Sequence, residues 1–78
     1  MKDILKLRNE IDTLDSKLMN ILDKRFTIAK KIGKIKKQNN IQKFDKNREK
    51  EILSKTNSST NKAKIKIVFK KILEEAKK

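Results

Sequence analysis

The stretch ILKLRNEIDTLDSKLMNILDKRFTIAKKIGKI, residues 4–35, decides the fold because its apolar side chains recur with the spacing of one helix face. One position breaks the pattern: Arg25 stands where the heptad requires an apolar residue. Burying an unpaired guanidinium is costly, so the sequence predicts an anion beside Arg25. The apolar positions, called the heptad seam below, are Ile4, Leu7, Ile11, Leu14, Leu18, Ile21, Ile28, Ile32 and Ile35.

The composition favours a small all-α protein that associates with itself. Of 78 residues, 35% are hydrophobic and 4% aromatic, so one chain has little apolar surface to bury. There is no proline, and the one glycine, Gly33, lies inside the helical pattern, so the turn signals of hairpins and sheets are missing. No apolar run approaches the ~18 residues of a membrane span, and the first residues are unlike a signal peptide. We therefore expect residues 1–78 to form a single cytoplasmic domain.

Three helices are predicted. The first runs over residues 2–38 or 2–39, a rod of roughly 55 Å at ~1.5 Å per residue. The remainder of the chain is too short to cover such a rod, so its seam is expected to pack against a second copy. The two asparagines of KKQNNIQKF break the pattern and predict a loop, in which Ile41 and Phe44 are candidate anchors.

The second and third helices are expected to be shorter. The second should begin near Asp45, whose carboxylate can cap the first turn, and continue through KNREKEILSK with Ile52 and Leu53 facing inward. TNSSTN, residues 56–61, has the composition of a loop followed by a helix cap. The third helix should run from Lys62 to the C-terminus with an apolar face made of Ile65, Val68, Phe69, Ile72, Leu73 and Ala76.

The side-chain inventory narrows the chemistry. With no cysteine and no histidine, the chain lacks the usual zinc ligands, a thiol nucleophile and a histidine base, so we predict no metal and no cofactor. The net charge of +13 predicts an anionic partner. Only Arg8, Arg25 and Arg48 are arginine among the 23 basic residues, and arginine offers a planar fork that grips carboxylates.

The spacing of these basic residues suggests a site shared between subunits. Lys36 follows Arg25 by eleven residues, so it projects from nearly the same helix face about 16 Å along the axis, which leaves room for one small anion. Arg8 precedes Arg25 by roughly 25 Å on a rigid helix. It could join the same site only from a second subunit packed antiparallel.

A second cluster lies where the second helix is expected to start. DKNRE places Asp45, Arg48 and Glu49 within one turn, beside free backbone amides that suit a hydroxylated anion. Each of these residues also has an ordinary interpretation: Asp45 as a helix cap, Arg48 and Glu49 as surface charges, and Lys36 as part of a solvated lysine run.

Taken together, LRNEIDTLDSKLMNILDKRFTIAKKIGKIKK and the following FDKNREKEIL resemble the all-helical chorismate mutases. The family pattern is Leu-Arg, Ile-Asp, Asp, Leu-Leu and Arg, Ile-Gly and Lys, then Asp and Arg-Glu. The resemblance covers residues 7–53 without a gap and extends into IKIVFKKILEE after a loop that is shorter than usual. It implies an intertwined homodimer of three-helix chains that converts chorismate to prephenate without a cofactor.

The resemblance also implies a role for each candidate residue. Arg25, with Arg8 from the partner chain, would bind the two carboxylates of chorismate, and Lys36 would donate to the ether oxygen and a carboxylate. Arg48 and Asp45 would orient the substrate, and Glu49 would accept a hydrogen bond from the ring hydroxyl.

The chain departs from the family at its end. Ala76 falls where some members carry a small hydroxyl residue, and the Gln or Glu usual one turn further would lie beyond Lys78. Loss of one such donor typically costs about 2.7–4 kcal/mol of transition-state stabilisation, so the sequence predicts weak mutase activity.

Three other functions stay open at this level. Isochorismate pyruvate lyase shares the fold and a similar lysine. A helical module that binds nucleic acid would use the charge, although the arginines are not clustered and any such binding is expected to be non-specific. A purely structural helical dimer would need no ligand at all.

Overall fold

The computed structural model describes residues 1–42 and 45–78, and these residues form helices and turns without a strand. Helix α1 spans Lys2–Gln38, α2 spans Lys46–Lys55, and α3 spans Lys62–Ala76, with a 3-10 turn, η1, at Thr56–Ser58. The prediction of an all-α protein with three helices is confirmed. The chain measures 56 × 24 × 15 Å, so α1 sets its longest dimension.

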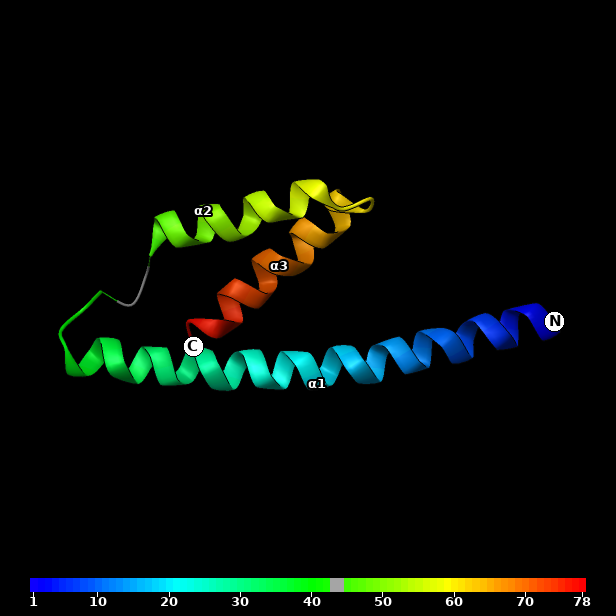
Figure 1. Ribbon diagram of the computed structural model, residues 1–78, viewed down its shortest axis with the longest axis horizontal. Helices are drawn as coiled ribbons and strands as arrows, with labels where there is room; N and C mark the ends of the chain where they lie inside the picture. The colour runs from blue at the N-terminus through cyan, green and yellow to red at the C-terminus, as the bar shows by residue number, and fades with distance from the viewer. Residues whose placement is uncertain (43–44) are drawn as a thin grey trace.

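Helices α2 and α3 fold back over the C-terminal half of α1, and the N-terminal half of α1 extends beyond them (Figure 1). Helix α3 contacts both α2 and α1, and η1 packs against both shorter helices. The ribbon in Figure 1 shows that α3 lies nearest α1 at its C-terminal end and diverges from it toward its N-terminal end.

The end of α1 is built by the two asparagines that the sequence marks as a break. Asn40 adopts a left-handed conformation with φ 55°, which asparagine tolerates better than most residues. The Ile41 N–H donates to the Lys36 carbonyl at 2.8 Å, and the Asn40 N–H donates to the Lys37 carbonyl at 3.3 Å. These two bonds form a Schellman motif that ends the helix at Gln38, directly before the cap residue Asn39. The predicted Phe44 anchor lies outside the described residues.

The core of the single chain is small. Ile72 and Leu73 of α3 are buried, and Ile52 and Leu53 of α2 are half-buried as predicted. Val68, which was expected on the inward face of α3, is 52% exposed. That prediction is wrong for the single chain, because the contacts of α3 with η1, α2 and α1 leave Val68 uncovered although its neighbour Phe69 is half-buried.

Two further predictions need correction at the ends of the shorter helices. Thr56, expected in a loop, is buried and closes α2, with its hydroxyl donating to the Leu53 carbonyl at 2.7 Å. Residues 56–58 continue the chain as the turn η1. At the other end α3 stops at Ala76, before the last two residues.

The heptad seam is uncovered along its whole length. Its nine apolar side chains range from 46% exposed at Ile4 to 61% exposed at Leu14. Soluble monomers rarely expose a continuous apolar stripe of this kind. Within the described residues, none of the helices combines the length and the apolar character that a membrane span requires.

Candidate active site

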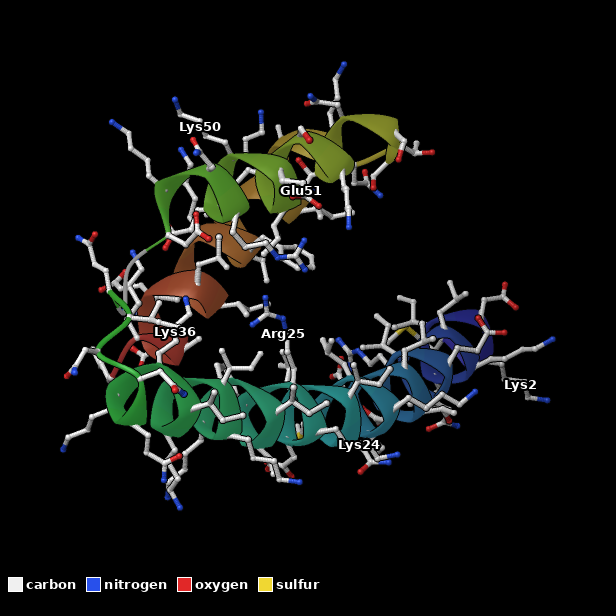
Figure 2. The ribbon with its side chains drawn as sticks, turned by 60° about the vertical axis from the view of Figure 1, so that its left-hand side comes forward. Lys2, Lys24, Arg25, Lys36, Lys50 and Glu51 are labelled. Atoms are coloured by element: carbon white, nitrogen blue, oxygen red, sulfur yellow. The ribbon has the colours of Figure 1, made fainter. Side chains whose placement is uncertain are left out.

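Arg25 lies in the half of α1 that α3 approaches, and its side chain is half-buried. Figure 2 shows it rising from α1 toward the space beneath α2 and α3, whereas Lys24 lies on another side of the helix. The helix fixes this direction, because Arg25 shares the seam face with Ile21 and Ile28, one turn before and one turn after.

Lys36 lies near the C-terminal end of α1 and is also half-buried. It lines the same cavity as Arg25, a space of about 310 Å³ between α1, the start of α2 and the end of α3. Ile32 and Gly33 form part of the wall between them. The two cations that the sequence places on one helix face thus border a single space.

The start of α2 supplies three more residues to this cavity: Asp45, Arg48 and Glu49. Asp45 is the helix cap, since its Oδ1 accepts a hydrogen bond from the Arg48 N–H at 3.0 Å. The Arg48 guanidinium is paired with Glu51 at 2.8 Å, and the Glu49 carboxylate is paired with Lys77 at 2.7 Å. The acidic groups at this helix start therefore already have partners.

Arg25 and Lys36 differ from those groups, because no other described residue forms an ion pair with either of them. In the described parts of the chain, neither residue takes part in an ion pair or a side-chain hydrogen bond. Cations that border a half-buried space and lack a counter-ion attract an anion more strongly than exposed lysines do. The arrangement suits a small molecule with negative charge at two points.

Arg8 is the predicted site residue that the single chain does not bring to this place. It is exposed, lies in the part of α1 that α2 and α3 leave uncovered, and lines neither this cavity nor the larger one beside it. Any contribution of Arg8 has to come from another copy of the chain.

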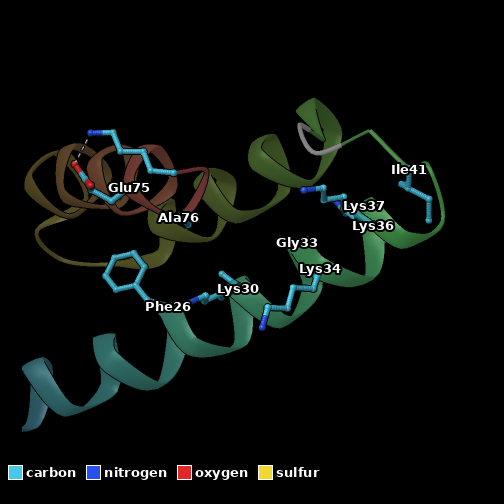
Figure 3. Close-up of a pocket in the computed structure, with 11 residues that line it drawn as sticks. Phe26, Lys30, Gly33, Lys34, Lys36, Lys37, Ile41, Glu75 and Ala76 are labelled. Carbon is cyan, nitrogen blue, oxygen red and sulfur yellow. Dashed lines mark hydrogen bonds and ion pairs between the residues drawn. The ribbon is translucent and has the colours of Figure 1, made fainter.

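A larger cavity of about 800 Å³ adjoins the first and shares Ala29, Gly33, Lys36 and Ala76 with it. Figure 3 shows Phe26 and Glu75 at one end and Ile41 at the other. Its border is rich in lysine: Lys30, Lys34, Lys36, Lys37 and Lys78.

Glu75 is the acidic residue of this larger border. Hydrogen bonds from Lys78 and Lys71, together with the charge of Lys78, hold the pKa of the Glu75 carboxyl below its ordinary value of 4.5. Glu75 thus stays charged through the neutral range, and it cancels only part of the positive charge of the larger cavity.

Two residues that line the smaller cavity, Ala29 and Lys77, were not predicted from the sequence as core or site residues. Ala29 lies on α1 between Arg25 and Gly33, and Lys77 caps the end of α3. The sequence offers no signal for Lys77, because it is one of 20 lysines and lies 28 positions from its partner Glu49.

The family model for chorismate mutase type II matches residues 7–78. The chain belongs to the chorismate mutase type II family. This match covers all three helices apart from the first turns of α1, and it includes every residue of the smaller cavity.

A relative points to the same family. Over 55 residues the chain is 38% identical to the bifunctional chorismate mutase/prephenate dehydratase of Aquifex aeolicus (strain VF5). The match covers 70% of this chain and 15% of that protein, so the chain spans a small part of the length of its relative. No solved structure matches the chain.

Proposed function

We propose that this protein is a chorismate mutase, which rearranges chorismate to prephenate. The observation that carries the proposal is the 310 Å³ cavity in which Arg25 and Lys36 share one space with Asp45, Arg48 and Glu49. Membership of the chorismate mutase type II family supports it, as does the relative whose name includes that activity.

In this proposal the two cations Arg25 and Lys36 bind the substrate as a dicarboxylate. Arg25 takes one carboxylate through its guanidinium fork, and Lys36 donates to the other carboxylate and to the ether oxygen. Arg48 and Asp45 orient the substrate from the start of α2, and Glu49 accepts a hydrogen bond from the ring hydroxyl. The cavity has room for one compact molecule of this size.

The reaction is an intramolecular rearrangement in which the ether C–O bond breaks while a C–C bond forms. It needs neither a nucleophile nor a proton relay, so the absence of histidine and cysteine from the sequence is no obstacle. Holding the side arm over the ring lowers the entropic part of the barrier. A cation beside the ether oxygen stabilises the negative charge that gathers there as the bond breaks.

The active unit in this proposal is a homodimer formed through the heptad seam, with Arg8 of one chain completing the site of the other. The exposed apolar side chains of α1 support this arrangement, because a second copy is the cover that fits a stripe of the same length and spacing. Each chain would then contribute one cavity, and the dimer would contain two identical sites.

The test is to follow the disappearance of chorismate and the appearance of prephenate with purified protein. The variant Lys36→Ala is expected to lower kcat/KM by about a hundredfold or more, since it removes the donor to the ether oxygen. Lys31→Ala is the matched control, because Lys31 is exposed on the same helix and lines neither cavity.

Two results would contradict the proposal. Equal rates for the wild type, Lys36→Ala and Lys31→Ala would show that the cavity does not carry the reaction. Release of pyruvate from isochorismate, with chorismate left unchanged, would assign the related lyase reaction to the same cavity.

A further inference from the structure

An ion pair joins the start of α2 to the end of α3 inside the smaller cavity. The Lys77 Nζ lies 2.7 Å from the Glu49 Oε2, and the two side chains are 40% and 24% exposed. The pairs of Arg48 with Glu51 and of Lys71 with Glu74, in contrast, lie within single helices. The Lys77–Glu49 pair therefore ties two elements together at the site, and it is more enclosed than those local pairs.

The charges around the cavity show what this pair changes. Four cationic side chains and two carboxylates line it, which leaves a net charge of +2. Asp45 is engaged as the cap of α2, and Arg48 is paired with Glu51, which does not line the cavity. The carboxylate of Glu49 is thus the acidic group that could compete with a ligand for Arg25 and Lys36.

Without Lys77, the carboxylate of Glu49 would compete directly with a ligand for Arg25 and Lys36. A half-buried carboxylate seeks a cation, and the candidates bordering the same space are Arg25 and Lys36. The net charge of the lining would also fall from +2 to +1. Both changes would weaken the binding of a molecule that carries two carboxylates.

We propose that Lys77 is a positioning residue that holds Glu49 away from Arg25 and Lys36 and so keeps these two cations available to the dicarboxylate substrate. The inference rests on the proposed mutase function and adds to it a residue that acts through Glu49. It also explains why a site that needs positive charge can contain Glu49. The ion pair with Lys77 balances the charge of the carboxylate, which can still accept a hydrogen bond from a hydroxyl group.

The test compares steady-state kinetics on chorismate for the wild type, Lys77→Met, Lys77→Arg and the double variant Lys77→Met/Glu49→Gln. Methionine keeps most of the apolar stem of Lys77 and removes the charge. We expect Lys77→Met to raise KM by about tenfold with a smaller change in kcat, and Lys77→Arg to restore KM. Lys70→Met is the control, because Lys70 is an exposed lysine of the same helix, α3, and lines neither cavity.

The double variant gives the sharpest result. If a released Glu49 occupies the cations, then Glu49→Gln should lower KM again in the Lys77→Met background, although it is a second change in the site. A merely structural salt bridge predicts the opposite, since the two losses would add or leave KM unaltered.

The outcomes separate the two proposals. Turnover by the wild type with an unaltered KM in Lys77→Met overturns the role of Lys77 and leaves the mutase function standing. A double variant with a KM no lower than that of Lys77→Met overturns the competition argument. If the wild type leaves chorismate unchanged, the proposed function fails, and the role of Lys77 fails with it.

Discussion

Arg25 occupies a position that the heptad reserves for an apolar side chain, between Ile21 and Ile28. A guanidinium there gives up apolar packing along the seam and places at the edge of the cavity a charge that no other described residue pairs with. Residues that lower stability at a site and have no structural partner are those expected to bind a ligand. Stability and activity should therefore respond in opposite directions when Arg25 is replaced.

The variant Arg25→Leu tests this opposition. Leucine completes the apolar pattern of the seam, so the free energy of unfolding is expected to equal or exceed that of the wild type. The kcat/KM for chorismate should fall by about a hundredfold or more, because a bidentate carboxylate contact is lost. Denaturant unfolding and steady-state kinetics measure the two effects. Lys24→Leu, on an exposed neighbouring position, should leave kcat/KM unchanged; an Arg25→Leu variant that keeps full kcat/KM would contradict the assigned role.

At the residue level, the sequence predicts local features better than long-range contacts. The cap of α2 by Asp45 could be predicted because the signal lies within four residues, and the Arg48 N–H bond confirms it. The pairing of Lys77 with Glu49 could not be predicted, since it depends on how α3 lies against α2. The site roles of Arg25, Lys36, Glu49, Asp45 and Arg48 stay predictions that the cavity supports.

At the scale of elements, the period of the apolar residues predicts each helix, but it does not predict how the helices pack against each other. The repeat of residues 4–35 predicts one long helix because each turn adds the same signal. Val68 fits the apolar period of α3 and is nevertheless exposed, whereas Phe69 in the same turn is half-buried, because the packing of α3 against its neighbours decides which part of its apolar face is covered. The buried Thr56 was missed for a similar reason, as its hydroxyl satisfies the end of α2 rather than a loop.

The heptad seam, together with the proposed place of Arg8 beside Arg25 of the other chain, specifies a register for the proposed dimer. If two copies of α1 cross antiparallel about a two-fold axis at Ser16, residues whose numbers add to 32 lie opposite each other. Each pairing then joins two seam positions, and Arg25 comes opposite Leu7, so that Arg8 of the partner lies beside it. The four pairings are 4 with 28, 7 with 25, 11 with 21, and 14 with 18.

Cross-linking tests this register, and the chain contains no cysteine that would interfere. Chains carrying Leu14→Cys and chains carrying Leu18→Cys, refolded together and oxidised, should form a mixed disulfide dimer, because positions 14 and 18 face each other. Each variant alone should remain uncross-linked under the same conditions. Non-reducing electrophoresis and mass spectrometry identify the product. A Leu18→Cys chain that couples efficiently to itself would indicate a parallel dimer and would remove Arg8 from the site.

The whole molecule carries a net charge of +13, and the larger cavity concentrates lysines next to the site that is proposed to bind a dianion. Such a field attracts any polyanion, so weak binding of duplex DNA without sequence preference is expected at low salt. For a mutase the same field would help to capture chorismate, since the positive potential of the larger cavity raises the local concentration of anions beside the site. Binding of DNA and capture of chorismate can be separated by experiment, because only the capture of chorismate depends on where the lysines lie.

The dependence of kcat/KM on salt is therefore expected to come from the lysines of the larger cavity. Between about 10 mM and about 500 mM ionic strength, where the Debye length falls from roughly 30 Å to a few ångströms, kcat/KM for chorismate should fall by about tenfold while kcat changes little. In a triple variant of Lys30, Lys34 and Lys37 to Gln, this fall should shrink to about threefold or less, because three of the five lysines that border the larger cavity have lost their charge.

The matched control removes the same amount of charge elsewhere, by changing Lys55, Lys62 and Lys64 to Gln, three exposed residues that line neither cavity. A general effect of net charge would flatten the salt dependence equally in both triple variants, since each lowers the formal charge by the same three units. Steering by the larger cavity flattens it in the first variant and leaves the control close to the wild type. Equal slopes in the two variants would thus show that the lysine border has no special part in substrate capture, whatever the total charge contributes.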